Sequence, residues 1–237
     1  TIGIHPAAIL NFDACDEALQ QQIIEKTSAY ASPKEYYIQR LVEGVATIAA
    51  AFHPKQVIVR LSDFKSNEYY NLLGGYLYEP TEENPMIGWR GAARYYSDNY
   101  KEAFSIECQA VKYVREKLGL NNLIVMIPFC RTPKELENVY AVMKDYGLER
   151  GKNNLKVYIM AEIPSNIILA KEFADNIDGF SIGSNDLTQL TLGVDRDSSL
   201  VSNVYDERNP AVTKSISKLI KVGKSRSKKV GICGQGP

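Results

Sequence analysis

The sequence lacks net charge, because 28 Lys and Arg residues balance 28 Asp and Glu residues along its 237 positions. Histidine is also scarce, with two residues in the whole chain. Domains that bind nucleic acid usually carry an excess of basic side chains on one face. The one basic cluster here, at residues 221–229, is equally typical of the solvated face of a terminal helix. We therefore do not expect nucleic acid to be the main ligand.

Paired cysteines and long apolar runs are also missing. The four cysteines, at positions 15, 108, 130 and 233, form no C-x-x-C pair and no metal-type spacing, which predicts reduced thiols. No apolar run approaches the roughly 20 residues of a membrane span, and the N-terminal residues lack the order of a signal peptide. These absences predict a cytoplasmic protein with no membrane attachment.

Short apolar runs are what the sequence has in abundance. Hydrophobic residues make up 45% of the chain, which argues against a disordered chain or a small disulfide scaffold. The runs are nearly continuous, as in parallel strands covered on both faces by helices. Expected strands are residues 57–61, 123–129, 156–163, 179–183 and 229–233. Helical patterns alternate with them at residues 33–51, 100–118, 133–146, 165–175 and 210–227. This alternation predicts an α/β fold and, without any linker or repeat, one domain over residues 1–237.

One long irregular segment, residues 74–91, contains the Gly-Gly, Glu-Pro and Asn-Pro pairs that mark loops. A loop of this length inside a compact domain usually has a function.

Polar residues capable of chemistry lie at the carboxyl end of nearly every expected strand. They are Arg60, Arg131, Glu162, Asn185 with Asp186, and Cys233. In a parallel α/β barrel such positions converge on one rim, where the active site lies. The alternative is that strands simply become polar where they meet solvent. That alternative accounts for one or two of these positions but poorly for all of them.

Glu162 and Asp186 are hard oxygen ligands on separate strand ends, which is typical of a Mg²⁺ site. Helix capping is the alternative for Asp186 and its neighbours. It does not account for Glu162, because Pro164 and Ser165 already supply the signals of a helix start. We therefore favour a metal for the pair.

Three arginines, Arg60, Arg90 and Arg196, stand beside small or turn residues. Guanidinium groups bind phosphate and carboxylate through two hydrogen bonds, so converging arginines indicate a small, multiply charged anion. Each one alone is more often part of a surface ion pair. Arg196, flanked by Asp195 and Asp197, has the weakest case from spacing.

Cys233 ends an apolar strand and precedes a glycine-rich turn at residues 234–236. A lone cysteine is more often a small buried hydrophobic residue, which is our interpretation of Cys15, Cys108 and Cys130. The place of Cys233 at a strand end makes it a candidate acid, base or nucleophile.

The two histidines receive no catalytic role. His5 and His53 each precede a proline, and neither has an acid at a spacing that would form a dyad.

Several segments also resemble a known family: residues 58–69 (IVRLSDFKSNEY), 84–91 (NPMIGWRG), 162–166 (EIPSN), 183–189 (GSNDLTQ) and 231–237 (GICGQGP). From end to end the chain is similar to the phosphoenolpyruvate (PEP)/pyruvate-binding barrel domain of the PEP-utilising enzymes. The Asn-Asp-Leu-Thr-Gln string is shared with pyruvate phosphate dikinase and with enzyme I of the sugar phosphotransferase system, so a PEP phosphotransferase of either type is the alternative function. The LSDFKSNEY and CGQGP strings resemble the phosphoenolpyruvate synthase (pyruvate, water dikinase) group.

The resemblance implies a (β/α)₈ barrel and a role for each matching residue. PEP or pyruvate would contact Arg60, Arg90, Glu162, Gly183, Ser184, Asn185, Asp186 and Arg196. Glu162 and Asp186 would hold Mg²⁺, and Cys233 would be the proton donor or acceptor at the substrate methylene.

The implied reaction converts ATP, pyruvate and water into AMP, PEP and phosphate, a step of gluconeogenesis. A phosphohistidine domain of the same full-length chain would deliver the phosphoryl group, and two copies would pair through the barrel domain. The ATP-grasp and phosphohistidine domains are absent from this sequence. With a short strand near Gly88–Arg90 we count six strands, which predicts a truncated barrel with strands 2–7 visible and strands 1 and 8 missing, inactive by itself.

Two other function classes remain open. One is a Mg²⁺-dependent barrel lyase acting on a pyruvate-like substrate, which would need the carboxylate pair but neither three arginines nor a strand-end cysteine. The other is a non-catalytic module that docks the phosphohistidine domain or mediates dimerisation. Turnover of PEP by the full-length parent protein would separate the first hypothesis from both.

Overall fold

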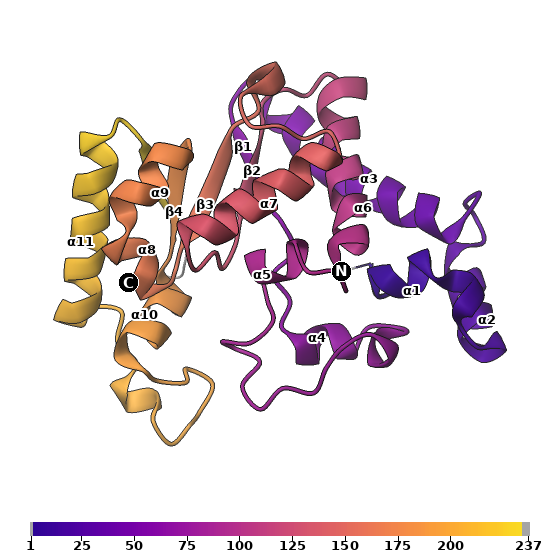
Figure 1. Cartoon of the computed structure of the whole chain (residues 1–237), viewed down its shortest axis with the longest axis horizontal. Coiled ribbons are helices and arrows are strands. Elements are labelled where there is room, and N and C mark those ends of the chain that lie inside the picture. The colour runs from indigo at the N-terminus through magenta and orange to yellow at the C-terminus, as the bar shows by residue number, and fades with distance from the viewer. Residues whose placement is uncertain (1, 234–237) are drawn as a thin grey trace. The chain divides into compact units, whose positions relative to one another are not determined.

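The computed structural model describes residues 2–233 and divides the chain into two compact units (Figure 1). Unit 1 comprises Thr1–Ile124 and Asn138–Leu155, and unit 2 comprises Val125–Glu137 and Lys156–Pro237. Strand β2 (Leu123–Ile127) and helix α7 (Pro133–Asp145) each run from one unit into the other. None of the helices among the described residues combines the length and the apolar character of a membrane span.

The sheet has five strands in the order β1-β2-β3-β4-β5, which is also their order along the chain. The other four are β1 (Val57–Arg60), β3 (Val157–Ala161), β4 (Gly179–Gly183) and β5 (Lys229–Cys233). β2, β3, β4 and β5 pair in parallel, with Ile159 opposite Phe180 and Gly183 opposite Cys233. Every residue of β2, β3 and β4 is buried, whereas β5 is largely exposed. The predicted α/β fold with a parallel sheet is confirmed.

The helices of unit 2 follow its strands. They are α8 (Pro164–Ile168), α9 (Ala170–Asn176), α10 (Ser184–Leu192) and α11 (Pro210–Ser225), with a 3₁₀ turn at Ser202–Val204. Helix α11 begins where the side chain of Asn209 accepts a hydrogen bond from Ala211 N–H and Pro210 takes the first helical position. Its buried face includes Val212, Leu219 and Gly223.

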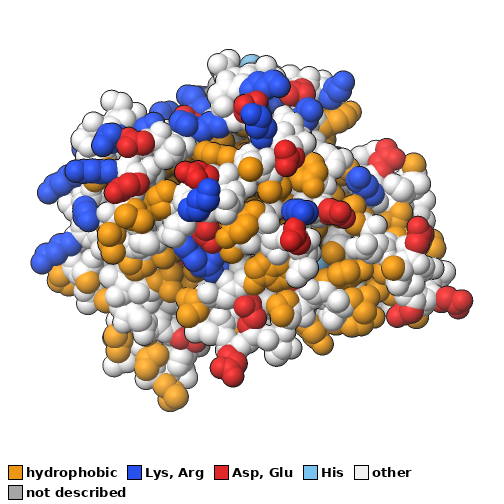
Figure 2. Space-filling view, in the orientation of Figure 1, with side chains coloured by type: hydrophobic (Ala, Val, Ile, Leu, Met, Phe, Trp, Pro, Cys, Tyr) orange, Lys and Arg blue, Asp and Glu red, His pale blue; other side chains and the backbone are white. Residues whose placement is uncertain are grey.

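The predicted basic cluster lies on the exposed side of this helix and just after it. Lys221, Lys224 and Arg226 are exposed, and Lys and Arg side chains gather over α11 at the left of Figure 2. Arg226 forms an ion pair with Asp175 at 2.6 Å. The cluster is therefore the solvated face of a terminal helix.

Unit 1 is mostly helical. Its helices are α1 (Pro6–Leu10), α2 (Glu17–Thr27), α3 (Pro33–Phe52), α4 (Ser66–Tyr70), α5 (Ala92–Tyr95) and α6 (Lys101–Lys112), continued by a π-helix at Tyr113–Lys117. There are also 3₁₀ turns at Phe12–Ala14, Gly75–Leu77 and Lys152–Asn154. A core cluster formed by Ile4, Ala8, Leu19 and Ile106 joins α1, α2 and α6.

The sequence-based boundaries are correct for most elements and wrong for three. The sixth strand near Gly88–Arg90 does not form, because Trp89 N–H donates to the Glu82 carboxylate and Arg90 N–H to the Gly88 carbonyl. These backbone groups are used by a loop instead of a neighbouring strand. The helix predicted at residues 165–175 is two short helices, and the helix predicted at residues 100–118 ends as a π-helix.

Gly223 gives a stability prediction, because a Cβ at that position would overlap Cγ2 of Val230 on β5. Gly223→Ala should destabilise the protein by about 1–2 kcal/mol, since overpacking costs more than the gain in helix propensity. Gly44→Ala is the matched control, because Gly44 lies in α3 and a Cβ there meets nothing within 4 Å. The control should raise the thermal unfolding midpoint and Gly223→Ala should lower it. Equal shifts would show that α11 does not pack closely on β5.

Candidate active site

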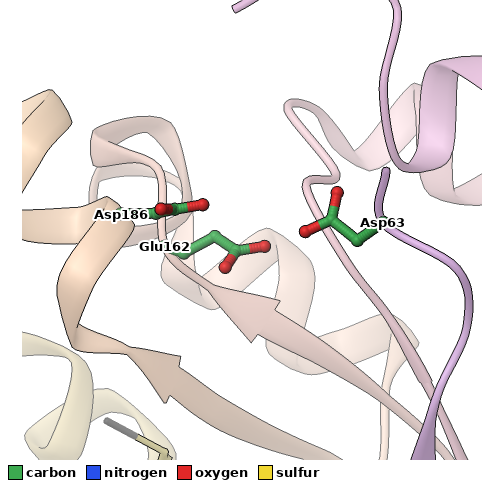
Figure 3. A group of neighbouring side chains, drawn as sticks. All are labelled: Asp63, Glu162 and Asp186. Atoms are coloured by element: carbon green, nitrogen blue, oxygen red, sulfur yellow. The ribbon is translucent and has the colours of Figure 1, made fainter. Parts of the chain in front are cut away.

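In unit 2, Glu162 and Asp186 follow the carboxyl ends of neighbouring strands β3 and β4 (Figure 3). A carboxylate oxygen of one lies within 4.8 Å of a carboxylate oxygen of the other. Glu162 is buried and accepts a hydrogen bond from Phe129 N–H at 2.8 Å. Two carboxylates this close could hold a divalent cation through their oxygen atoms. Figure 3 also labels Asp63, which belongs to unit 1.

The turn after β3 is fixed by Asn166. Its Oδ1 accepts from Glu162 N–H at 3.2 Å and Ile163 N–H at 3.1 Å, and its Nδ2 donates to the Cys130 carbonyl at 2.7 Å. Because Asn166 is fully buried, these bonds are shielded from water. The backbone that carries Glu162 is therefore held in one place.

Gly183 makes the close approach of Glu162 to β4 possible. A Cβ on Gly183 would lie 2.6 Å from Glu162 Oε2. Gly183 is also the N-cap of α10, and no side chain forms a capping hydrogen bond there. Asp186 lies in the first turn of α10, beyond the cap. Asp186 is therefore not the N-cap of α10, and the capping alternative is wrong for this residue.

A second polar group in unit 2 centres on Asn185. With its side-chain amide assigned in the orientation that satisfies both neighbours, Asn185 donates from its amide nitrogen to Glu207 Oε1 at 2.7 Å and accepts at its amide oxygen from Arg196 Nη1 at 3.3 Å. Glu207 also accepts from Tyr205 Oη at 3.3 Å and Ser184 Oγ at 3.4 Å. Burial and the Glu207 carboxylate raise the pKa of Tyr205, so its hydroxyl stays a donor. Glu207, which sequence reasoning missed, therefore connects the predicted residues Ser184 and Asn185, and Asn185 in turn contacts Arg196.

Cys233 ends β5 directly opposite Gly183. It is the exposed one of the four cysteines, and all four are free thiols. Ser181 Oγ donates to its Sγ at 3.5 Å, and the thiol lies 3.5 Å from the Ile182 carbonyl. The glycine-rich turn predicted at residues 234–236 lies outside the described residues.

The other three cysteines are buried, as predicted, and burial raises the pKa values of their thiols. Arg131, also at a strand end, has its Nη1 3.6 Å from Glu135 in the first turn of α7.

In unit 1, Arg60 and Arg90 meet at the carboxylate of Asp63. Arg90 donates from Nε to Oδ1 at 3.0 Å and from Nη2 to Oδ2 at 2.7 Å. Arg60 Nη1 lies 3.7 Å from the same Oδ2, and its side chain is 48% exposed, whereas that of Arg90 is 6% exposed. Sequence reasoning missed Asp63, although it lies in the LSDFKSNEY string.

His5 has no acid close to it in the sequence, but it has an acidic partner from a distant segment. His5 Nε2 lies 2.9 Å from Glu79 Oε1, and both residues are buried. The partner is 74 positions away in the sequence, so local spacing could not reveal it.

Comparisons with known proteins agree with the resemblance of the motifs. The family model described as "PEP-utilising enzyme, PEP-binding domain" matches residues 18–237. The phosphoenolpyruvate synthase of Synechocystis sp. is 57% identical over 238 residues, which cover 100% of this chain and 29% of that protein. The phosphoenolpyruvate synthase of Aquifex aeolicus is 63% identical over 217 residues, which cover 92% of this chain and 25% of that protein. The phosphoenolpyruvate synthase of Escherichia coli is 56% identical over 236 residues, which cover 100% of this chain and 30% of that protein.

The chain thus spans less than a third of the length of these relatives. Among solved structures, the citrate synthase SbnG aligns with a TM-score of 0.43 and 13% identity over 82% of this chain and 74% of that one. That score is too low to support an inference.

The contact between Gly183 and Glu162 predicts how a small substitution would affect cation binding. Gly183→Ala should displace the Glu162 carboxylate and weaken Mg²⁺ or Mn²⁺ binding about tenfold, roughly the loss of one charged contact. Gly231→Ala in β5 is the control, because a Cβ there meets nothing within 4 Å. Calorimetric titration with Mn²⁺ measures both variants. Unchanged affinity in Gly183→Ala would show that Glu162 does not hold the cation.

Proposed function

This chain belongs to the PEP-utilising enzymes, as their PEP-binding domain, and from that membership we propose that it binds PEP and pyruvate in a phosphoenolpyruvate synthase. The identity of more than half of the residues to phosphoenolpyruvate synthases over the whole chain is the observation that carries the proposal. The overall reaction would convert ATP, pyruvate and water into AMP, PEP and phosphate.

We propose that the five strands are part of a (β/α)₈ barrel. Support comes from the strand order, because each strand of such a barrel neighbours the next one along the chain. The largely exposed β5 is consistent with an edge that further strands of a closed barrel would cover. Such a barrel would be cytoplasmic and would pair with a second copy through this domain.

Anion binding is assigned to the arginines. Arg60, Arg90 and Arg196 would bind phosphate and carboxylate groups of PEP through their guanidinium groups. The support is that Arg90 is held rigidly on Asp63, and that Arg196 contacts Asn185 in the segment that would touch the substrate. The side chain of Arg60 is half exposed, so it can be reached from solvent.

The carboxylates of Glu162 and Asp186 would hold Mg²⁺. Their closeness and their oxygen donors fit this ion. Bound there, Mg²⁺ would supply positive charge to the enolate oxygen and to the phosphoryl oxygens. The Phe129 N–H would keep the Glu162 carboxylate in place for this task, and Asn166 would keep the backbone that carries it in place.

Cys233 would act on the proton at C3 of pyruvate. Its thiolate removes this proton, and the enolate oxygen attacks the phosphorus of a phosphohistidine on another domain, whose P–N bond breaks. In the reverse direction the thiol returns the proton to C3. The exposure of Cys233 and its place opposite Gly183 support the assignment.

Because the chain spans less than a third of the length of its relatives, ATP use and histidine phosphorylation would belong to other parts of a longer enzyme. This chain alone would be inactive.

Cys233→Ala tests the proposed function. In full-length enzyme containing this chain, it should abolish PEP formation and leave phosphorylation of the carrier histidine by ATP intact, because the thiol acts only at C3. Loss of C3 proton exchange from pyruvate in D₂O, followed by NMR, gives the direct measurement. Cys15→Ala, which removes a buried thiol of unit 1, should keep the exchange. Persistent exchange in Cys233→Ala, or loss of carrier phosphorylation, would refute the assigned role.

A further inference from the structure

A buried arginine that the proposed reaction does not use lies four residues after Arg90. Arg94, in α5, has no exposed surface and donates to both carboxylate oxygens of Glu79, at 2.6 and 2.7 Å. His5 binds the same carboxylate through Nε2. Because Ala7 N–H donates to His5 Nδ1 at 3.1 Å, Nε2 carries the proton and donates to Glu79. The charge of Arg94 is therefore compensated by one carboxylate whose position is fixed from two sides.

Aromatic rings enclose the guanidinium group of Arg94. It lies 3.9 Å from the ring centroid of Trp89, 4.4 Å from that of Tyr69 and 5.0 Å from that of Tyr100. A planar guanidinium can stack on these rings and at the same time donate to both oxygens of a carboxylate, a geometry that a lysine ammonium does not reproduce. The site therefore requires arginine specifically.

Arg94 also holds the backbone just before Arg90. Its Nη2 donates to the Trp89 carbonyl at 3.0 Å. The Trp89 N–H donates to Glu82 Oε1 at 3.0 Å, and Glu82 in turn accepts from Ser66 Oγ at 2.6 Å. Both backbone groups of Trp89 are thus bound by charged side chains. A loop segment would otherwise be among the more mobile parts of a domain.

Arg90 follows directly in this fixed segment. Its side chain is clamped on Asp63 and donates from Nη1 to the Met86 carbonyl at 3.3 Å. The direction of the Arg90 side chain depends on where the Trp89 peptide lies. Displacements of about 1 Å at a binding group can cost up to roughly 100-fold in rate. A buried ion pair adds little net stability compared with apolar residues, so positional accuracy is a reason for its presence here.

We propose that Arg94 is a positioning residue, which fixes the Trp89 peptide and thereby sets Arg90 in place for the anionic substrate. The proposal rests on the proposed function of Arg90 as a PEP-binding arginine. Arg94 itself does not touch substrate. Glu79 and His5 act through Arg94 by fixing its guanidinium.

The test compares Arg94→Lys, Arg90→Met and the double variant in full-length enzyme containing this chain. Arg94→Lys should raise the dissociation constant of PEP about tenfold, the loss expected from one misplaced charged contact. In the Arg90→Met background, Arg94→Lys should cause no further loss, because the residue through which it acts is gone. If Arg94→Lys folds poorly, Glu79→Gln replaces it in the test, because glutamine keeps the shape of the carboxylate. Glu79→Gln should also raise the dissociation constant of PEP about tenfold.

Arg115→Lys is the matched control. Arg115 is another buried arginine of unit 1, and it donates to the carbonyls of Asn121 at 3.1 Å and Asn153 at 2.7 Å. Its substitution should lower the unfolding midpoint as much as Arg94→Lys does and leave PEP affinity unchanged.

Three outcomes separate the hypotheses. Non-additive losses in affinity support the positioning role. Additive losses, or an Arg94→Lys variant with unchanged affinity, overturn the positioning role and leave the proposed function intact. Unchanged affinity in Arg90→Met overturns the proposed function of that arginine and the positioning role with it.

Discussion

Two of the arginines buried in unit 1, Arg90 and Arg94, each form an ion pair, and the arrangement of residues 79–94 depends on these two pairs. Arg90 binds Asp63 and Arg94 binds Glu79, each through two hydrogen bonds. Removing one partner of such a pair costs about 3–5 kcal/mol, because a charge remains buried without compensation. Together with the hydrogen bonds of Trp89, these pairs fix the position of the Arg90 guanidinium group accurately, although residues 79–91 contain no helix or strand.

Unit 2 achieves the same accuracy by different means. Its strands are buried and parallel, and their carboxyl ends carry Glu162, Asp186 and Cys233. The absence of a side chain at Gly183 lets the Glu162 carboxylate approach β4. In unit 2 the sheet places the side chains at the strand ends, and Gly183 leaves space for the Glu162 carboxylate. In unit 1, ion pairs place the side chains instead.

The sequence predicts the features that depend on local pattern. Apolar runs locate all five strands, and polar residues after them identify Glu162, Asp186 and Cys233. Features that depend on distant partners are missed: Glu207 lies in an irregular loop, and Glu79 meets His5 from 74 positions away. Helix α1 has five residues, four of them buried, so it shows no amphipathic period. The strand predicted at Gly88–Arg90 does not form, because the backbone N–H and carbonyl of Trp89 are hydrogen-bonded to the side chains of Glu82 and Arg94.

The most direct test of the account is a crystal structure of full-length enzyme containing this chain, with PEP and Mn²⁺ bound. Anomalous scattering locates the manganese independently of the protein atoms. The account predicts manganese on the carboxylates of Glu162 and Asp186, and the PEP phosphate on the guanidinium groups of Arg60 and Arg90. Manganese or phosphate bound to other side chains would contradict it.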